Sequence, residues 1–164
     1  MPSLVGSEMC IRDRVKGYIN SKGKTIIPFQ FMYCTDFSEG LAGVEKNGKW
    51  GYINKKGHLK IRMKYTGGGK FSEGLVEVTK KIRKQDKWGF INKKGEKVIP
   101  FKFDFAFNFV HGMAIIQEGD KWGIINKEGK YLVNAQFEDI WFDQLEDLVI
   151  VQKEGKWGII KIIK

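Results

Sequence analysis

The feature that most constrains the fold of this chain is a nine-residue motif that recurs at nearly constant spacing. It reads Lys-Trp-Gly, then Tyr, Phe or Ile, then Ile-Asn-Lys, any residue and Gly, and it is complete at 49–57, 87–95 and 121–129. Residues 16–23 carry a copy without the Trp, and residues 156–160 carry the first half. The motif glycines stand at 17, 51, 89, 123 and 158, so successive copies are 34, 38, 34 and 35 residues apart. A fixed period of this length indicates a repeat architecture.

Other landmarks recur between the copies of this motif. Ile-Pro-Phe occurs at 27–29 and 99–101, and Phe-Ser-Glu-Gly-Leu occurs at 37–41 and 71–75 with a weaker version at 109–113. The longest unit exceeds the 34-residue units by four residues, which we place in the segment 79–86. The whole unit therefore repeats, and not the Trp-Gly motif alone.

These residues resemble the bacterial WG (or KWG) repeat family over about residues 15–164. The Trp-Gly pair, the Asn-x-x-Gly turn, the Ile-Pro pair and the Phe-Ser-Glu-Gly-Leu segment carry the resemblance. The resemblance implies a β-rich repeat within a bacterial protein and implies no defined activity. It therefore bears on architecture more than on function.

The residue pattern within a unit predicts three short strands. In the first, residues 50–54, Trp50 and Tyr52 point to one face and Ile53 to the other, which is typical of a strand covered on both sides. Asn54 to Gly57 then has the residues of a turn, because the Asn side chain can bond the following backbone and Gly tolerates positive φ. The second strand covers 59–63 and the third 75–78. Pro28 and Pro100 end or edge the second strand, since proline cannot donate to a ladder.

We therefore predict an all-β array of units of about 35 residues. Each unit is a three-stranded antiparallel sheet, stacked as an open β superhelix or solenoid, because so small a sheet is marginal alone. A propeller-like closed array is the alternative, although propeller blades usually have four strands and about 40–45 residues. We expect a ladder of tryptophans in the core, with the motif glycines beside it: Trp50, Trp88, Trp122 and Trp157, with Gly51, Gly89, Gly123 and Gly158.

Residues 1–14 match nothing in the repeats. The segment SEMCIRDR resembles translated sequencing-adapter read-through, so we predict that residues 1–14 are a non-native, disordered leader. Residues 15–164 then form one array. Its units are 15–48, 49–86, 87–120, 121–155 and a terminal half-unit, 156–164.

The search for catalytic chemistry gives little. His58 and His111 occupy non-equivalent repeat positions and are interpreted as surface residues, and Cys34 as a small, semi-buried residue. Glu39 and Glu73 recur at one repeat position, which favours a turn or hydrogen-bonding role on successive units. The segment 67–70, Gly-Gly-Gly-Lys, lacks the spacing of a phosphate loop. We expect no enzyme, and no catalytic, cofactor or metal site.

Charge provides one candidate binding surface. The chain holds 29 Lys plus Arg against 19 Asp plus Glu, a net charge of +10. Lysines recur at the Asn-x-x-Gly turns, and the four-residue insertion is basic. A basic stripe could bind nucleic acid or an acidic glycan, although lysines at turns and edges also act only to keep a protein soluble. The candidate residues are Lys55, Lys56, Lys80, Lys81, Arg83, Lys84, Lys93 and Lys94.

Aromatic residues offer another surface. Phe103, Phe105, Phe107 and Phe109 alternate along the chain and could stack on sugars or bases, although core packing is the favoured use. The leading hypothesis for function is a monomeric module that binds a protein partner for interaction or scaffolding. Binding of an anionic polymer through the lysines, or of glycan through exposed aromatics, is the alternative. No apolar run is long enough to span a membrane, and the sequence assigns no compartment.

Overall fold

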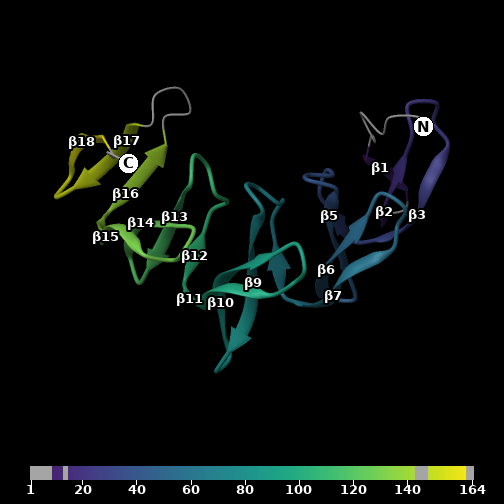
Figure 1. The fold of residues 1–164 in the computed structure, drawn as a ribbon, viewed down its shortest axis with the longest axis horizontal. Coiled ribbons are helices and arrows are strands. Elements are labelled where there is room, and N and C mark those ends of the chain that lie inside the picture. The colour runs from purple at the N-terminus through teal and green to yellow at the C-terminus, as the bar shows by residue number, and fades with distance from the viewer. Residues whose placement is uncertain (1–8, 13–14, 143–147, 162–164) are drawn as a thin grey trace.

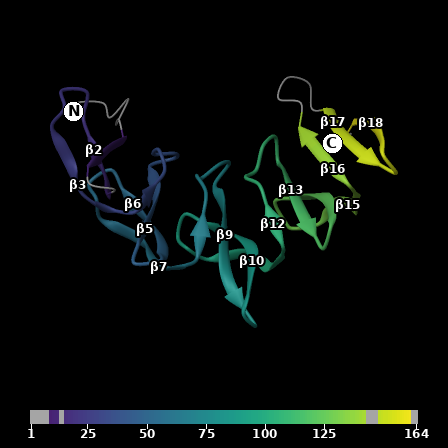
Figure 2. The ribbon, with the colours of Figure 1, turned by 180° about the vertical axis from the view of Figure 1, so that it is seen from behind.

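The chain folds into an open arc of small sheets. The structure, a computed structural model, describes residues 9–12, 15–142 and 148–161. These residues form eighteen strands and no helix, arranged as five antiparallel sheets in chain order. The first and last sheets lie at opposite ends of the arc (Figure 1), and the view from behind shows the same open form (Figure 2). The prediction of an open all-β array is thus confirmed, and the closed alternative is not what the chain adopts.

Each sheet is a meander in which three long strands recur. The first sheet contains β1 (Met9–Arg12), β2 (Val15–Ile19) and β3 (Thr25–Phe31). The second contains β4 (Tyr33–Cys34), β5 (Leu41–Lys46), β6 (Lys49–Asn54) and β7 (Leu59–Tyr65). The third contains β8 (Gly67–Gly68), β9 (Leu75–Ile82), β10 (Gln85–Asn92) and β11 (Lys97–Phe103). The fourth contains β12 (Phe105–Ala106), β13 (Met113–Glu118), β14 (Lys121–Asn126) and β15 (Tyr131–Phe137). The last contains β16 (Asp139–Phe142), β17 (Leu148–Lys153) and β18 (Lys156–Lys161).

The second to fourth sheets hold a fourth strand that the sequence pattern did not predict. The strands β4, β8 and β12 are two residues long and pair with the strand that follows them in the chain. Two residues are too few to show the alternation that identifies a strand from sequence. Each of these three sheets therefore begins at its short strand, earlier in the chain than the Trp-Gly motif at which the units were divided.

The segment at the N-terminal end also differs from expectation. Residues 9–12 form β1 and pair with β2, with Met9 opposite Tyr18 and Arg12 opposite Val15. The expectation of disorder is therefore wrong for these four residues, because β1 takes the place that β5 holds in the next sheet. The rest of the predicted leader, residues 1–8 and 13–14, lies outside the described residues.

The Asn-x-x-Gly segments form the predicted turns. The side chain of Asn54 accepts hydrogen bonds from the backbone amides of Lys56 (3.0 Å) and His58 (2.9 Å), and Gly57 has a φ of 79°. Asn20, Asn92 and Asn126 accept the same pair of bonds in their turns. An Asn side chain that satisfies two amides and a Gly with positive φ together fix each turn.

Close backbone packing requires the glycine in three of the Trp-Gly pairs, at Gly51, Gly89 and Gly123. The pairing register of β6 with β7 shifts between Trp50 and Tyr52, so the partner strand bulges toward Gly51. A Cβ on Gly51 would lie 2.7 Å from the carbonyl oxygen of Ile61, too close for any side chain. Pro28 and Pro100 lie at the same bulge in β3 and β11, which are edge strands. The predicted edge position of the prolines is confirmed, and their missing N–H groups disturb no inner ladder.

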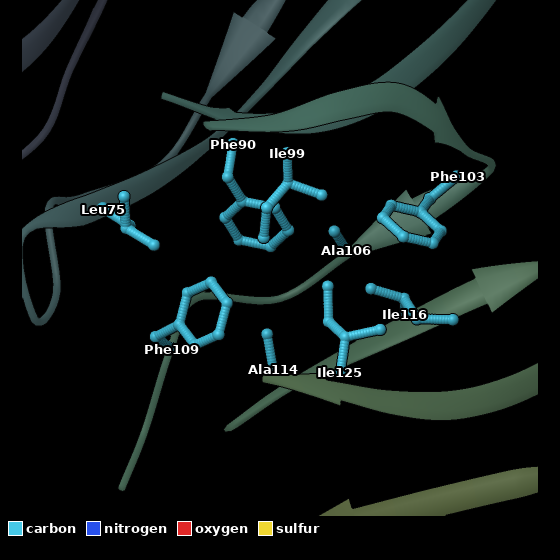
Figure 3. Packing of buried hydrophobic residues seen from close by; sticks show 9 residues of the cluster. All are labelled: Leu75, Phe90, Ile99, Phe103, Ala106, Phe109, Ala114, Ile116 and Ile125. Atoms are coloured by element: carbon cyan, nitrogen blue, oxygen red, sulfur yellow. The ribbon is translucent and has the colours of Figure 1, made fainter. Parts of the chain in front are cut away.

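The hydrophobic core lies between successive sheets and not within any one of them. Figure 3 shows one such layer, in which Phe90 and Ile99 of the third sheet face Phe109, Ala114 and Ile125 of the fourth. Equivalent layers join the first sheet to the second, the second to the third, and the fourth to the last. Adjacent residues such as Tyr52 and Ile53 belong to layers on opposite faces of one sheet. The predicted burial of both faces is confirmed.

The expected tryptophan ladder is not the core of this array. Trp50, Trp88 and Trp122 are only half-buried, and Trp157 is 55% exposed. The core position is held instead by the residue two places later, which is fully buried in Tyr52, Phe90 and Ile124. The indole of Trp50 lies over Gly43 of the neighbouring strand, where a Cβ would come within 2.7 Å of the ring. The bulky indole thus covers the rim of the sheet, because the centre is filled by the next side chain on that face.

The motif glycines give a matched test of the bulge. A Cβ on Gly123 would lie 2.7 Å from the backbone nitrogen of Ala135, whereas a Cβ on Gly158 would meet nothing within 4 Å. We predict that Gly123→Ala lowers the free energy of unfolding by about 1–3 kcal/mol, as for other overpacked sites. Gly158→Ala should change it by less than about 0.5 kcal/mol. Urea titration of both variants measures the difference, and equal effects would contradict the role given to the bulge.

Candidate binding groove

The turns that precede β5, β9 and β13 gather on the concave side of the arc. In Figure 1, β8 and β12 run up toward this side and β9 and β13 run back from it, and Figure 2 shows the same arrangement. Two cavities lie against these segments, one of about 450 Å³ and one of about 520 Å³. Both are lined by Asn108, so they adjoin. We call them the polar cavity and the apolar cavity, and together the inner groove.

The floor of the inner groove is built by hydrogen bonds that cross from one unit to the next. The hydroxyl of Ser38 donates to the carbonyl of Phe71 (2.6 Å), and the hydroxyl of Ser72 donates to the carbonyl of Phe109 (2.7 Å). Each Ser lies in a Ser-Glu-Gly turn, and each acceptor lies just before the next such turn. The next copy of the turn has Val110 in place of Ser, so this hydroxyl contact does not continue there.

Glutamates of the same turns form a second set of contacts between units. The carboxylate of Glu39 accepts from the backbone amide of Gly74 (3.1 Å) and pairs with Lys93 at 2.8 Å. Glu73 does the same with the amide of Gly112 (3.0 Å) and with Lys127 at 3.0 Å. The partners lie on the following unit in both cases. The predicted hydrogen-bonding role of Glu39 and Glu73 on successive units agrees with these contacts.

The electrostatics of these glutamates follow from those contacts. Partial burial alone would raise the pKa of Glu39, but the hydrogen bonds from Lys93 and from the Gly74 amide lower it overall. The pKa of Glu73 is lowered in the same way by Lys127 and Gly112. Both carboxylates therefore stay ionised at neutral pH and link neighbouring units.

The polar cavity contains a carboxyl group of a different kind. Glu77 points from β9 into this cavity and is only 9% exposed. Its oxygen Oε2 accepts no hydrogen bond from any residue that the structure describes. Burial raises the pKa of Glu77 to about 7, opposed by a hydrogen bond from its own backbone amide. A buried carboxyl with an unused acceptor is costly to ionise and therefore unusual.

The three consecutive glycines make room for Glu77. A Cβ on Gly69 would overlap Oε1 of Glu77, and a Cβ on Gly68 would lie 2.5 Å from the hydroxyl of Tyr52. The glycines thus form β8 and one wall of the cavity, and they do not form a phosphate loop. Sequence reasoning missed Glu77. When the units are aligned, Glu77 occupies the repeat position that is Gly43 in the unit before and Ile115 in the unit after, so it is the charged residue among these three.

The apolar cavity lies between the fourth and last sheets. Its walls include Ile115 and Ile140, which are buried, and Phe107 and Trp141, which are 47% and 59% exposed. Phe103 and Phe109, the ends of the alternating phenylalanines, are fully buried in the layer below. The alternation therefore divides between core and surface, as the rings of Phe103 and Phe109 stabilise the stack while the ring of Phe107 meets solvent.

A comparison with known families finds the same tandem repeat, divided at the Trp-Gly motifs. The sequence model described as WG containing repeat matches residues 17–50, 50–81, 88–122 and 122–157. The chain belongs to the WG repeat family. A comparison with curated proteins gives no match. Family membership thus establishes a tandem β repeat module and leaves its binding partner to be inferred from the inner groove and the rest of the surface.

The candidate lysines of this WG array lie in two separate places. Lys55, Lys56, Lys93 and Lys94 are exposed at the Asn-x-x-Gly turns, but Lys93 is engaged in the ion pair with Glu39. The other basic residues extend the hairpin between β9 and β10, which projects from the convex side of the arc (Figure 1). These residues are Lys80, Lys81, Arg83 and Lys84, all exposed. The four-residue insertion therefore lengthens one hairpin and does not join the turn lysines.

The remaining candidates, Cys34, His58 and His111, lie at three separate places in the array. Cys34 is buried, and burial raises the pKa of its thiol. His58 is exposed at a turn, and His111 is exposed beside the apolar cavity. The described part of the chain holds no group of three or more metal-binding side chains and no helix that could span a membrane.

Glu77 gives the WG array a pH dependence that can be measured. The folded chain holds the Glu77 proton up to about pH 7, whereas the unfolded chain releases it near 4.5. The carboxyl therefore costs no stability below that lower value, and its cost grows as pH rises toward and through 7. We predict that titration of Glu77 lowers the free energy of unfolding of wild type by roughly 3 kcal/mol between pH 4.5 and pH 8. This loss should be absent in Glu77→Gln.

Urea unfolding of wild type, Glu77→Gln and Glu128→Gln at both pH values tests this expectation. Glu128 is exposed in the turn between β14 and β15, so its variant should follow wild type. Parallel pH dependence of wild type and Glu77→Gln would show that Glu77 titrates normally.

Proposed function

We propose that this WG array is a non-enzymatic module that binds an extended segment of a protein partner in the inner groove. The observation that carries the proposal is the pair of adjoining cavities on the concave side, one polar and one lined by exposed aromatic rings. Binding sites in proteins are usually concave and combine apolar walls with a few fixed polar groups. Repeat arrays commonly use such a concave surface to bind their partners.

The contacts that hold the groove's turns to the next unit support the same proposal. Its floor consists of turns held to the next unit by Ser38, Ser72, Glu39 and Glu73, and its core contacts are fully buried rings. A pre-formed site loses little conformational entropy on binding, so it suits recognition of a flexible segment. Exposed aromatic rings such as those of Phe107 and Trp141 are typical of the residues that contribute most to protein interfaces.

Selection of random twelve-residue peptides displayed on phage tests the proposal. We predict enrichment of peptides that bind wild type and lose at least tenfold in affinity on Phe107→Ser with Trp141→Ser. Both side chains are about half exposed, so the variant should keep its fold, which circular dichroism and a melting curve check. The control, Lys81→Ala with Lys84→Ala, changes the convex hairpin and should leave affinity unchanged. Failure to enrich peptides that depend on the groove would overturn the proposal.

A second candidate function is the binding of an anionic polymer by the hairpin between β9 and β10. Its tip residues Arg83 and Lys84 have φ values of 48° and 71°, where the equivalent turn of the previous sheet has Asn47 and Gly48. Positive φ costs of order 1 kcal/mol or more in residues with long side chains. The tip therefore carries two basic residues at positions whose backbone conformation favours Asn or Gly. Two basic residues at an exposed tip favour an anionic ligand.

Titration with heparin and with single-stranded DNA at low and moderate salt separates the two functions. Polymer binding by the hairpin would fall steeply with salt and would weaken when Lys80, Lys81, Arg83 and Lys84 become Ala. Peptide binding in the inner groove would be unchanged by those substitutions. The exposed rings of Phe107 and Trp141 could also stack on a glycan, in which case a sugar, and not a peptide, would compete for the groove.

A further inference from the structure

The hydroxyl groups and the carboxylate that line the polar cavity offer mainly hydrogen-bond acceptors. The donor side chains among the lining residues are Lys70, whose ammonium pairs with Asp36, and Asn108, whose amide donates to the carbonyl of Phe109 (3.4 Å). The hydroxyl of Thr35 donates to the carbonyl of Asp36 (3.0 Å), and those of Ser38 and Ser72 donate to Phe71 and Phe109. Each hydroxyl has one hydrogen, so what it can still offer to the cavity is a lone pair. The carboxylate of Glu77 adds an oxygen that accepts no hydrogen bond from the described residues.

The cation nearest this cavity does not neutralise Glu77. Lys70 lines the cavity, but its ammonium group pairs with Asp36 at 3.3 Å. The other glutamates of the turns, Glu39 and Glu73, already have lysine partners. Within the described groove, Glu77 is thus the carboxylate that lacks a cationic partner. A ligand that brings a positive charge would offset the cost of burying this carboxylate.

We propose that the polar cavity binds the cationic side chain of a lysine or arginine on an extended peptide, whose neighbouring apolar side chain enters the apolar cavity. The proposal rests on the proposed function of the inner groove and adds the chemistry of the segment that it binds. Both side chains supply several N–H donors and a positive charge, which complement a cavity rich in acceptors that holds an unpaired carboxylate.

The apolar cavity selects the residue that neighbours the cation in the peptide. Asn108 belongs to both cavities, and beyond it the walls include Phe107, Trp141 and Ile115. These side chains present rings and a methyl surface but no carboxylate, so they favour an aromatic or large aliphatic residue. The expected recognition pattern is therefore a basic residue close in sequence to an apolar one. The array would bind this pattern although it carries a net charge of +10 itself.

The twelve-residue peptides enriched by phage selection on wild type also test this pattern, when their affinity for the Glu77→Gln variant is measured. We expect enriched peptides to carry Lys or Arg within a few residues of an aromatic or large aliphatic residue. Their affinity should fall at least tenfold on Glu77→Gln and less than twofold on Glu128→Gln. Replacing the Lys with norleucine, or the Arg with citrulline, should cause a similar loss, and exchanging Lys for Arg shows which cation fits better. Loss of folding does not explain the first effect, because removing the buried charge should stabilise the array at neutral pH.

Two outcomes separate this inference from the function on which it rests. Enriched peptides that depend on Phe107 and Trp141, but lack a basic residue or bind Glu77→Gln equally well, would overturn the inference and leave the groove a peptide site. No enrichment of groove-dependent peptides would overturn both.

Discussion

Burial of both faces of each sheet against its neighbours is the constraint on which the rest of this structure depends. A sheet of three or four short strands cannot hold enough apolar surface to be stable alone. Here Tyr52 packs toward the third sheet and Ile53 toward the first, so adjacent residues of one strand stabilise two different interfaces. Stability is consequently a property of neighbouring pairs of sheets, as in other repeat arrays.

The same stacking creates the inner groove. The aromatic pairs Tyr18–Phe37, Tyr52–Phe71 and Phe90–Phe109 recur with ring centroids 4.8–5.1 Å apart and hold the start of each Ser-Glu-Gly turn against the previous sheet. Glutamates of these turns then bond to the next unit. Variation is permitted where the stack does not need a particular side chain. The position that is Gly43 in one unit and Ile115 in another is Glu77 between them, and this difference gives one cavity its charge.

Sequence reasoning predicted the parts of the fold that local chemistry determines. The Asn-x-x-Gly turns, the strands of alternating polarity and the edge prolines were predictable because each depends on a few adjacent residues. The place of Trp50 was not, because its rim position depends on Gly43 in a neighbouring strand and on Tyr52 taking the core. Glu77 was missed for a similar reason, since its cavity arises only when β8 and the adjoining turns come together.

Native-state hydrogen exchange on wild type and Phe90→Ala tests most directly whether the stack is the unit of stability. Phe90 is fully buried between the third and fourth sheets and contacts Phe109. If stability is shared across the interface, protection should fall by a similar free energy, about 3–5 kcal/mol, in β9–β11 and in β13–β15. A loss of protection confined to β9–β11 would show that each sheet is stable by itself and would contradict this account.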